Sequence, residues 1–242
     1  MIVRLVWGGA EATALLRTCG PIIVIDALRM SATVIVALHR GMTIVPVATA
    51  EEALRSKNEE GMLTAGERGG KKIAELDLGN SPTELLHQQG LEGRCLALTT
   101  SHGIPALLAV KDHAHPVLIG SPLNLGALVE LIEQRHPPEL ALFLAGQTKN
   151  AAGEDAMTAS LLLERLGVST EADLPSPIPA ADLEAFFLKT QSAARLLALG
   201  YEADVHFCAQ VDRYPIVPEF RAGRIASTFP KRRVRPYTSL QE

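Results

Sequence analysis

Short apolar runs alternate with longer amphipathic stretches along most of the chain. The short runs have the length of buried strands, and the longer stretches place apolar residues at helical spacing. Strands are predicted over 2–6, 22–25, 43–47, 62–65, 95–98, 117–119 and 140–144. Helices are predicted over 31–40, 50–57, 104–110, 122–135 and 154–166, and one more begins at Ser81. This alternation predicts an α/β fold, a layered α/β/α sandwich around a largely parallel or mixed sheet.

The pattern changes after about residue 170. Three prolines lie within 173–179, which is typical of a linker or an excursion. A helix is predicted over 181–199. The strand-like stretch 205–225 is interrupted by Pro215 and Pro218, which favours an edge strand or an extended arm. We therefore expect a single α/β domain over 1–242, with an excursion or sub-domain after about 170 as an option.

Polar residues gather where the predicted strands end. In parallel sheets, ligands bind beyond the carboxyl ends of the strands. The polar loops at these ends are 26–29, 66–68, 99–103, 120–121 and 145–148. One edge of the sheet is therefore expected to carry the chemistry.

The stretch 66–70, Gly-Glu-Arg-Gly-Gly, indicates an anion site. Glycines let backbone amides approach a ligand, and Arg68 can bind an oxyanion through two parallel hydrogen bonds. Farther along, Ser81 can cap a helix, with Pro82 in its first turn and Glu84 completing a capping box. A helix N-terminus beside an arginine loop suits a phosphate or another multiply charged anion.

Acidic residues at the strand ends have two interpretations each. Asp26 can hold magnesium, which prefers oxygen ligands, or it can form an ion pair with Arg29. Glu154 and Asp155 can bind the same metal, or they are acids favoured by the dipole of a first helical turn. Asp77 is either a turn residue or a ligand brought in by the glycine-rich loop.

The loop 99–103, Thr-Thr-Ser-His-Gly, can surround a phosphate with hydroxyls and helix-start amides, or it can be an ordinary helix cap. His102 can protonate a leaving alkoxide, since imidazole titrates near neutrality. The alternative for His102 is a plain surface residue.

Composition excludes several classes of function. The formal net charge of −4 and the 4% aromatic content argue against a nucleic-acid interface. No apolar run approaches about 18 residues, so no membrane span is predicted. The three cysteines, Cys19, Cys95 and Cys208, are widely spaced and suit a reducing cytoplasm. The basic run 231–235 is a solvated tail or a subunit contact, which leaves a homo-oligomer open.

Taken together and in order, these motifs resemble the 2-phosphosulfolactate phosphatase family from about residue 22 to 225. The matching segments are 26–33, 66–70, 77–82, 99–103, 119–121 with Asn124, 145–146 with 154–155, and 207–212. The chain departs from the usual family pattern at Met30-Ser31, Ser101-His102 and Ile104-Pro105.

The resemblance implies a magnesium-dependent phosphatase that converts 2-phosphosulfolactate into 3-sulfolactate and phosphate, a step of coenzyme M biosynthesis in organisms that make that coenzyme. The candidate catalytic residues are Asp26, Arg29, Arg68 and Asp155. The candidate metal ligands are Asp26, Asp77, Glu154 and Asp155. The candidate phosphate- and substrate-binding residues are Ser31, Thr33, Glu67, Gly69, Gly70, Asn80, Ser81, Thr99, Thr100, Ser101, His102, Gly103, Ser121 and Asn124.

Several points stay open at this stage. Either Asp26 or a water molecule on the metal can be the nucleophile. Another small phosphorylated hydroxy acid can be the substrate, and a non-catalytic anion-binding protein is the third alternative.

Overall fold

A computed structural model describes residues 1–8, 20–59, 61–146 and 153–228. Within these ranges, ten strands form a sheet in the order β1-β8-β2-β7-β9-β10-β3-β6-β4-β5. In that order the strands are Ile2–Trp7, Glu139–Leu144, Ile22–Ile25, Val117–Gly120, Pro218–Arg221, Arg224–Ser227, Thr43–Pro46, Cys95–Thr99, Met62–Arg68 and Lys71–Lys72. Part of the predicted loop 145–148, the basic run 231–235 and Cys19 lie outside the described residues.

The sheet consists of two parallel blocks joined by an antiparallel hairpin. Strands β1, β8, β2 and β7 are parallel, and so are β3, β6 and β4. The hairpin β9–β10 lies between the blocks, where Phe220 pairs with Val117 and Ile225 pairs with Ile44. The predicted mixed α/β sheet is therefore confirmed.

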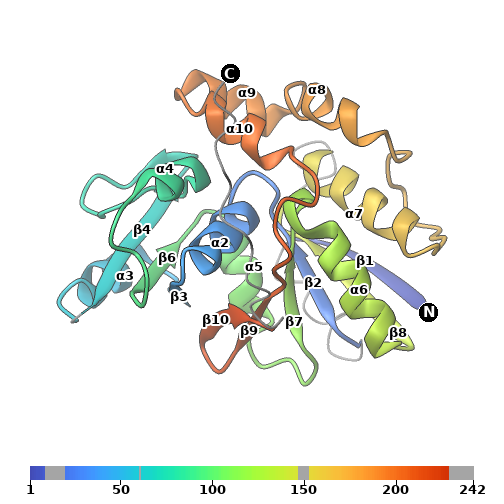
Figure 1. Ribbon diagram of the computed structural model, residues 1–242, viewed down its shortest axis with the longest axis horizontal. Helices are drawn as coiled ribbons and strands as arrows, with labels where there is room; N and C mark the ends of the chain where they lie inside the picture. The colour runs from blue at the N-terminus through green and yellow to red at the C-terminus, as the bar shows by residue number, and fades with distance from the viewer. Residues whose placement is uncertain (9–19, 60, 147–152, 229–242) are drawn as a thin grey trace, which may run out of the picture.

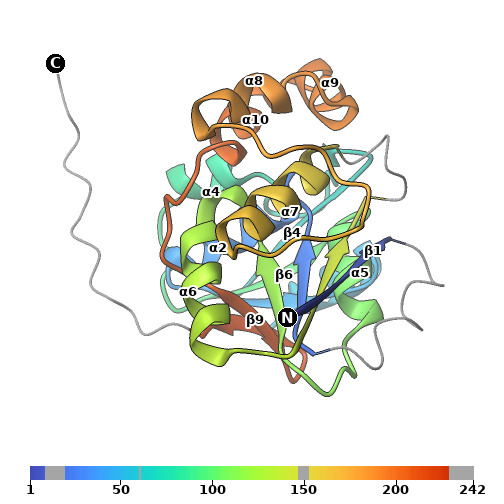
Figure 2. The same cartoon turned by 90° about the vertical axis from the view of Figure 1, so that its right-hand side faces the viewer.

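Helices cover both faces of the sheet, which explains why the central strands are apolar without alternation. All four residues of β2 are fully buried. The described helices are α2 Met30–His39, α3 Ala50–Ser56, α4 Pro82–His87, α5 Gly103–Ala109, α6 Leu125–Arg135, α7 Gly153–Arg165, α8 Leu183–Phe187, α9 Gln191–Ala198 and α10 Glu202–Cys208, with short 3₁₀ turns Pro122–Asn124 and Ala180–Asp182. Figures 1 and 2 show α2, α4 and α6 on one face and α5 on the other.

The region after residue 180 differs from its prediction. The predicted helix 181–199 is interrupted between α8 and α9, because the Thr190 hydroxyl caps a new helix by accepting from the Ala193 amide. The stretch 202–208 is the helix α10 and not a strand. Its buried Val205 and Phe207 are two residues apart, which imitates the alternation of a strand.

The hairpin also corrects the expectation of an edge strand or extended arm. Pro218 is the first residue of β9, a position where its missing amide hydrogen is tolerated. The strand then lies inside the sheet, between β7 and β10.

Helices α8, α9 and α10 form a cap above one end of the sheet (Figure 2). Leu183, Phe187, Leu196 and Val205 anchor this cap, because they belong to the same buried cluster as the strands. Among the described residues, no helix combines the length and the apolar character needed to cross a membrane.

Candidate active site

A pocket lies at the carboxyl ends of β2, β4 and β6, beneath α9. Its volume is about 70 Å³, which is small beside the ~300–1,000 Å³ of sites for drug-sized ligands. The pocket is lined by Asp26, Leu28, Arg29, Glu67, Gly69, Gly70, Asn80, Ser101, His102, Ser192, Arg195 and Leu196. Three separate loops predicted from the sequence therefore meet at one place.

Asp26 follows β2 and is held by the start of two helices. Its Oδ1 accepts from the Met30 amide at 3.4 Å, and its carboxylate also accepts from the Gly103 amide. A Cβ at residue 103 would lie 2.3 Å from Asp26 Oδ2, so only glycine permits this approach. Burial, followed by the negative charges of Glu67 and Glu154, raises the pKa of Asp26 to about 7. The ionised form of this carboxylate thus lacks sufficient positive partners.

Two further acids lie behind Asp26 at the start of α7. Asp155 joins two strand ends, since Oδ1 accepts from the Ala27 amide at 2.7 Å and Oδ2 from the Gly146 amide at 3.3 Å. Burial and the charges of Glu154 and Asp26 raise the pKa of Asp155 well above its usual range. Burial also raises the pKa of Glu154, and its Oε2 has no hydrogen-bond partner among the described residues.

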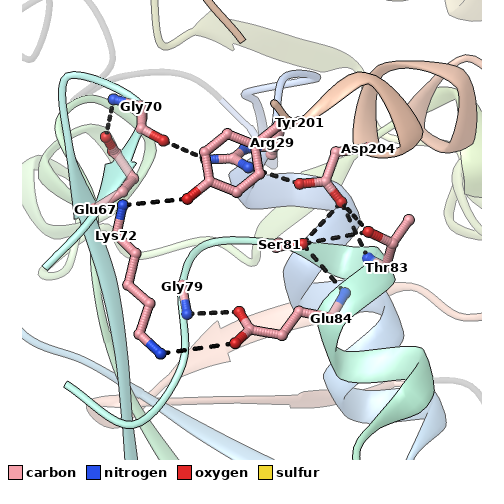
Figure 3. A network of polar contacts seen from close by, with 10 residues as sticks. All are labelled: Arg29, Glu67, Gly70, Lys72, Gly79, Ser81, Thr83, Glu84, Tyr201 and Asp204. Carbon is pink, nitrogen blue, oxygen red and sulfur yellow. Dashed lines mark hydrogen bonds and ion pairs between the residues drawn. The ribbon is translucent and has the colours of Figure 1, made fainter. Parts of the chain in front are cut away.

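Arg29 is held in place on three sides (Figure 3). Its Nη1 lies 2.6 Å from Asp204 Oδ2, its Nη2 donates to the Gly70 carbonyl at 2.7 Å, and its guanidinium lies 4.1 Å from the ring centre of Tyr201. Asp204 also accepts from the Ser81 hydroxyl at 2.8 Å. Asp204 was not predicted. The stretch 205–225 was interpreted as strand, so the first turn of α10, which contains Asp204, was not recognised.

Glu67 connects the glycine turn with the hydroxyl loop. Its Oε2 accepts from the Gly70 amide at 2.6 Å, and its Oε1 accepts from the Ser101 amide at 2.6 Å. Glu67 thus lies in the pocket, where a role in binding phosphate was predicted for it. Both oxygens are already engaged, and a carboxylate repels phosphate, so its contacts are those of a positioning residue.

Asn80 lies just before α4, whose first turn is capped by Ser81 through the Glu84 amide at 3.1 Å. The Glu84 carboxylate does not complete the predicted capping box, because it accepts from the Gly79 amide at 2.7 Å instead (Figure 3). Asn80 is 4% exposed, and its Oδ1 has no hydrogen-bond partner among the described residues. An unpaired buried acceptor in a pocket is open to a hydrogen bond from water or a ligand, or to an ion.

Arg68 and Asp77 are among the predicted site residues that do not line the pocket. Arg68 is exposed and donates to Thr99 Oγ1 at 2.9 Å, because neighbouring residues of a strand point to opposite faces and Glu67 takes the pocket side. Asp77 pairs with Lys57 at 2.7 Å and accepts from the Thr64 amide at 3.0 Å. Its carboxylate therefore stabilises the turn after β4.

Two of the predicted hydroxyls accept hydrogen bonds from backbone amides near the starts of α2 and α5. Thr100 Oγ1 accepts from the Ile104 amide at 2.9 Å at the start of α5, and Ser31 Oγ accepts from the Asp26 amide at 3.0 Å. Thr33 is buried, and its hydroxyl has no partner among the described residues. None of the three lines the pocket.

Ser121 and Asn124 form a capping box away from the pocket. Asn124 Oδ1 accepts from the Ser121 amide at 2.9 Å, and Asn124 Nδ2 donates to the Ile216 carbonyl at 2.9 Å. These bonds fasten the segment that leads to the hairpin.

The residues from α9 were not predicted. Ser192, Arg195 and Leu196 follow the helical spacing of three and four, so they share one face that turns toward the pocket. No local motif surrounds them, and only the folding of the cap brings them to the strand ends.

The chain is similar to one group of phosphatases over most of its length. A family model described as 2-phosphosulpholactate phosphatase matches residues 11–223. A probable 2-phosphosulfolactate phosphatase of Thermotoga petrophila is 34% identical over 217 residues, which cover 85% of this chain and 91% of the relative. One of Thermus thermophilus is 33% identical over 218 residues, covering 84% and 89%. A 2-phosphosulfolactate phosphatase of Methanothermobacter thermautotrophicus is 34% identical over 210 residues, covering 85% and 89%.

Proposed function

Because this chain belongs to the 2-phosphosulfolactate phosphatase family, we propose that it hydrolyses 2-phosphosulfolactate to 3-sulfolactate and phosphate. The observation that carries the proposal is that Asp26, Arg29, Asn80 and His102, from four different segments, line one small pocket. A pocket at the strand ends of an α/β sheet is where such folds place their ligands.

Arg29 is the residue proposed to bind the phosphoryl oxygens. Two of its five N–H groups serve Asp204 and Gly70, so three remain for a ligand. Its burial and its contact with Tyr201 fix the guanidinium before the substrate arrives. Donors that are already oriented stabilise developing charge without reorganisation during the reaction.

The oxygen atoms of the pocket fit a magnesium ion. Asp26 is a carboxylate whose charge lacks compensation, and Asn80 Oδ1 is an unpaired buried acceptor in the same pocket. Among the described residues, no group of three or more His, Cys, Asp or Glu is placed to hold a metal. Magnesium commonly uses one or two protein carboxylates, several waters and the substrate's phosphate. Asp26 and Asn80 are therefore the proposed ligands, and the ion would supply positive charge to the phosphate oxygens.

His102 is the proposed proton donor to the departing hydroxyl of sulfolactate. It is half-buried in the pocket and precedes the first residue of α5. A protonated imidazole can donate its proton to an alkoxide as the ester bond breaks. The attacking group is proposed to be water, and the Asp26 side chain is assigned to metal binding.

The test is phosphate release from 2-phosphosulfolactate with magnesium and with excess chelator. Turnover that depends on magnesium is expected. Absence of phosphate release from folded protein in the presence of magnesium would refute the proposal.

A substrate panel separates this activity from that of a phosphatase for another hydroxy acid. The highest kcat/KM is expected for 2-phosphosulfolactate, ahead of phospholactate and phosphoglycerate. Binding of 3-sulfolactate without any turnover would identify a non-catalytic anion-binding protein instead. Homo-oligomer formation, a cytoplasmic location and a place in coenzyme M biosynthesis stay predictions from the sequence.

A further inference from the structure

A second arginine, Arg195 of α9, lines the pocket from the helical cap. It is an exposed residue on the face of α9 that turns toward the pocket, and its side chain has no hydrogen bond or ion pair with any residue that the structure describes. We propose that Arg195 binds an acidic group of the substrate other than its phosphate, and so determines specificity. This inference rests on the proposed function.

The charges of the pocket support this role. Arg29 is neutralised by Asp204, and the pocket also contains the carboxylates of Asp26 and Glu67. Of the two pocket arginines, Arg195 is thus the one without an ion pair among the described residues. The proposed substrate has a carboxylate and a sulfonate besides its phosphate, and each of these groups needs a positive partner when it leaves water.

Arg195 lies close enough to Arg29 for one short substrate to contact both, with its phosphate on Arg29 and a second acidic group on Arg195. The side-chain carbon Cδ of Arg195 lies 3.9 Å from the point where a Cβ on Gly70 would be. The carbonyl of the same Gly70 accepts from Arg29. Both arginines thus adjoin Gly70. When the phosphate of a small substrate contacts Arg29, the carboxylate or sulfonate of the same molecule is within reach of the Arg195 side chain.

The chemistry of arginine also fits. A guanidinium presents parallel N–H donors that match the oxygens of a carboxylate, and it is less strongly hydrated than an ammonium group. Because Arg195 comes from a separate helix, its removal leaves the Asp26, Arg29 and Asn80 part of the pocket in place. Binding of the acidic group and binding of phosphate are therefore separable by mutation.

The experiment measures ligand affinity by calorimetry, so it does not depend on turnover. For Arg195→Ala, the Kd of 3-sulfolactate is expected to rise about 10- to 100-fold, the usual effect of losing a hydrogen bond between charged groups. The Kd of inorganic phosphate is expected to change less than about twofold, because an exposed charge outside the phosphate subsite is screened. Arg195→Lys should weaken 3-sulfolactate binding less than Arg195→Ala.

Lactate has a carboxylate but no sulfonate, so its binding shows which of the two acidic groups Arg195 contacts. Weaker lactate binding in Arg195→Ala assigns the contact to the carboxylate, and unchanged lactate binding assigns it to the sulfonate. Arg221→Ala is the matched control, because Arg221 is an exposed arginine of β9 outside the pocket, and it should bind all three ligands like the wild type.

The inference is overturned if Arg195→Ala binds 3-sulfolactate like the wild type, if it loses phosphate affinity to the same extent, or if the wild type does not bind 3-sulfolactate. Failure of the proposed function looks different. In that case no phosphate is released from 2-phosphosulfolactate, while Arg195→Ala still selectively loses 3-sulfolactate.

Discussion

The guanidinium of Arg29 lies 2.6 Å from the carboxylate of Asp204, and the two side chains are only 2% and 1% exposed. The residues are 175 positions apart in the sequence. Their contact joins α10 to the segment that follows β2, so the helical cap is fixed to the strand ends that line the pocket. Because the same arginine lines the pocket, the stability of the fold and the proposed binding of phosphate depend on the same ion pair.

Removing one partner of this pair should strongly destabilise the fold. Asp204→Ala and Arg29→Ala are each expected to lower the free energy of unfolding by about 3–5 kcal/mol, since each leaves a buried charge unpaired. The double variant should lose less than the sum of the single losses, because the second substitution removes a charge that is already unpaired. Urea unfolding followed by circular dichroism measures all three, and additive losses would contradict the coupling.

Asn80 and Asn124 are both buried, so their alanine variants can be compared as a matched pair. Asn80→Ala should change the free energy of unfolding by less than about 1 kcal/mol, because its Oδ1 has no partner among the described residues. Its kcat/KM should fall at least about 10- to 100-fold, because losing a proposed metal ligand should cost no less than losing a residue that only orients the ligands.

Asn124→Ala should do the reverse. It removes bonds to Ser121 and Ile216 outside the pocket, so stability should fall by about 2–3 kcal/mol while KM stays unchanged. Equal kinetic losses in Asn80→Ala and Asn124→Ala would argue against the role given to Asn80.

Gly103 is the closest neighbour of Asp26 on α5. Gly103→Ala places a methyl carbon 2.3 Å from Asp26 Oδ2 and 2.7 Å from Met30 Cβ, which should cost about 1–3 kcal/mol of stability. Displacing Asp26 by a fraction of an ångström or more should reduce kcat about 100-fold. Gly153→Ala is the control, since its added carbon would meet only Thr190 Cγ2 at an ordinary 3.7 Å. Full activity in Gly103→Ala would show that Asp26 tolerates the shift.

The raised pKa of Asp26 predicts the direction of a pH effect on stability. This pKa rises from 3.8 to about 7 on folding, so between these values the folded protein holds a proton that the unfolded chain releases. Ionisation of Asp26 therefore lowers stability as the pH rises. Asp26→Asn removes this loss, and its Tm relative to the wild type should be higher at about pH 8 than at about pH 5 when a chelator is present. A Tm difference that is constant with pH would contradict a raised pKa.

Much of the parallel sheet followed from local sequence, because buried strands such as 22–25 and helix caps such as Ser81 depend on neighbouring residues. The loops after β2, β4 and β6 were expected at one edge because ligands bind beyond the carboxyl ends of parallel strands, and the pocket lies there. Arg68 was expected in the site but points away from the pocket. Neighbouring residues of a strand point to opposite faces, so the position of Glu67 on the pocket side would have predicted this.

The cap could not be derived in the same way. The helix α10 has buried residues at strand-like spacing, and the partners of Asp204 are 121 or more positions away. Arg195 is likewise an ordinary exposed helical residue until α9 is placed above Gly70. Its neighbours in space, and not those in sequence, distinguish it.

The hairpin β9–β10 has a consequence for how the chain is made. It is the connection between the two parallel blocks, yet ribosomes synthesise residues 218–227 after every other described strand. Until then, β7 and β3 each lack a neighbour and leave backbone groups unpaired, which is the condition that favours association between chains. Newly made chains should therefore depend on chaperones up to the last stages of translation, and loss of the hairpin should lead to aggregation of the protein.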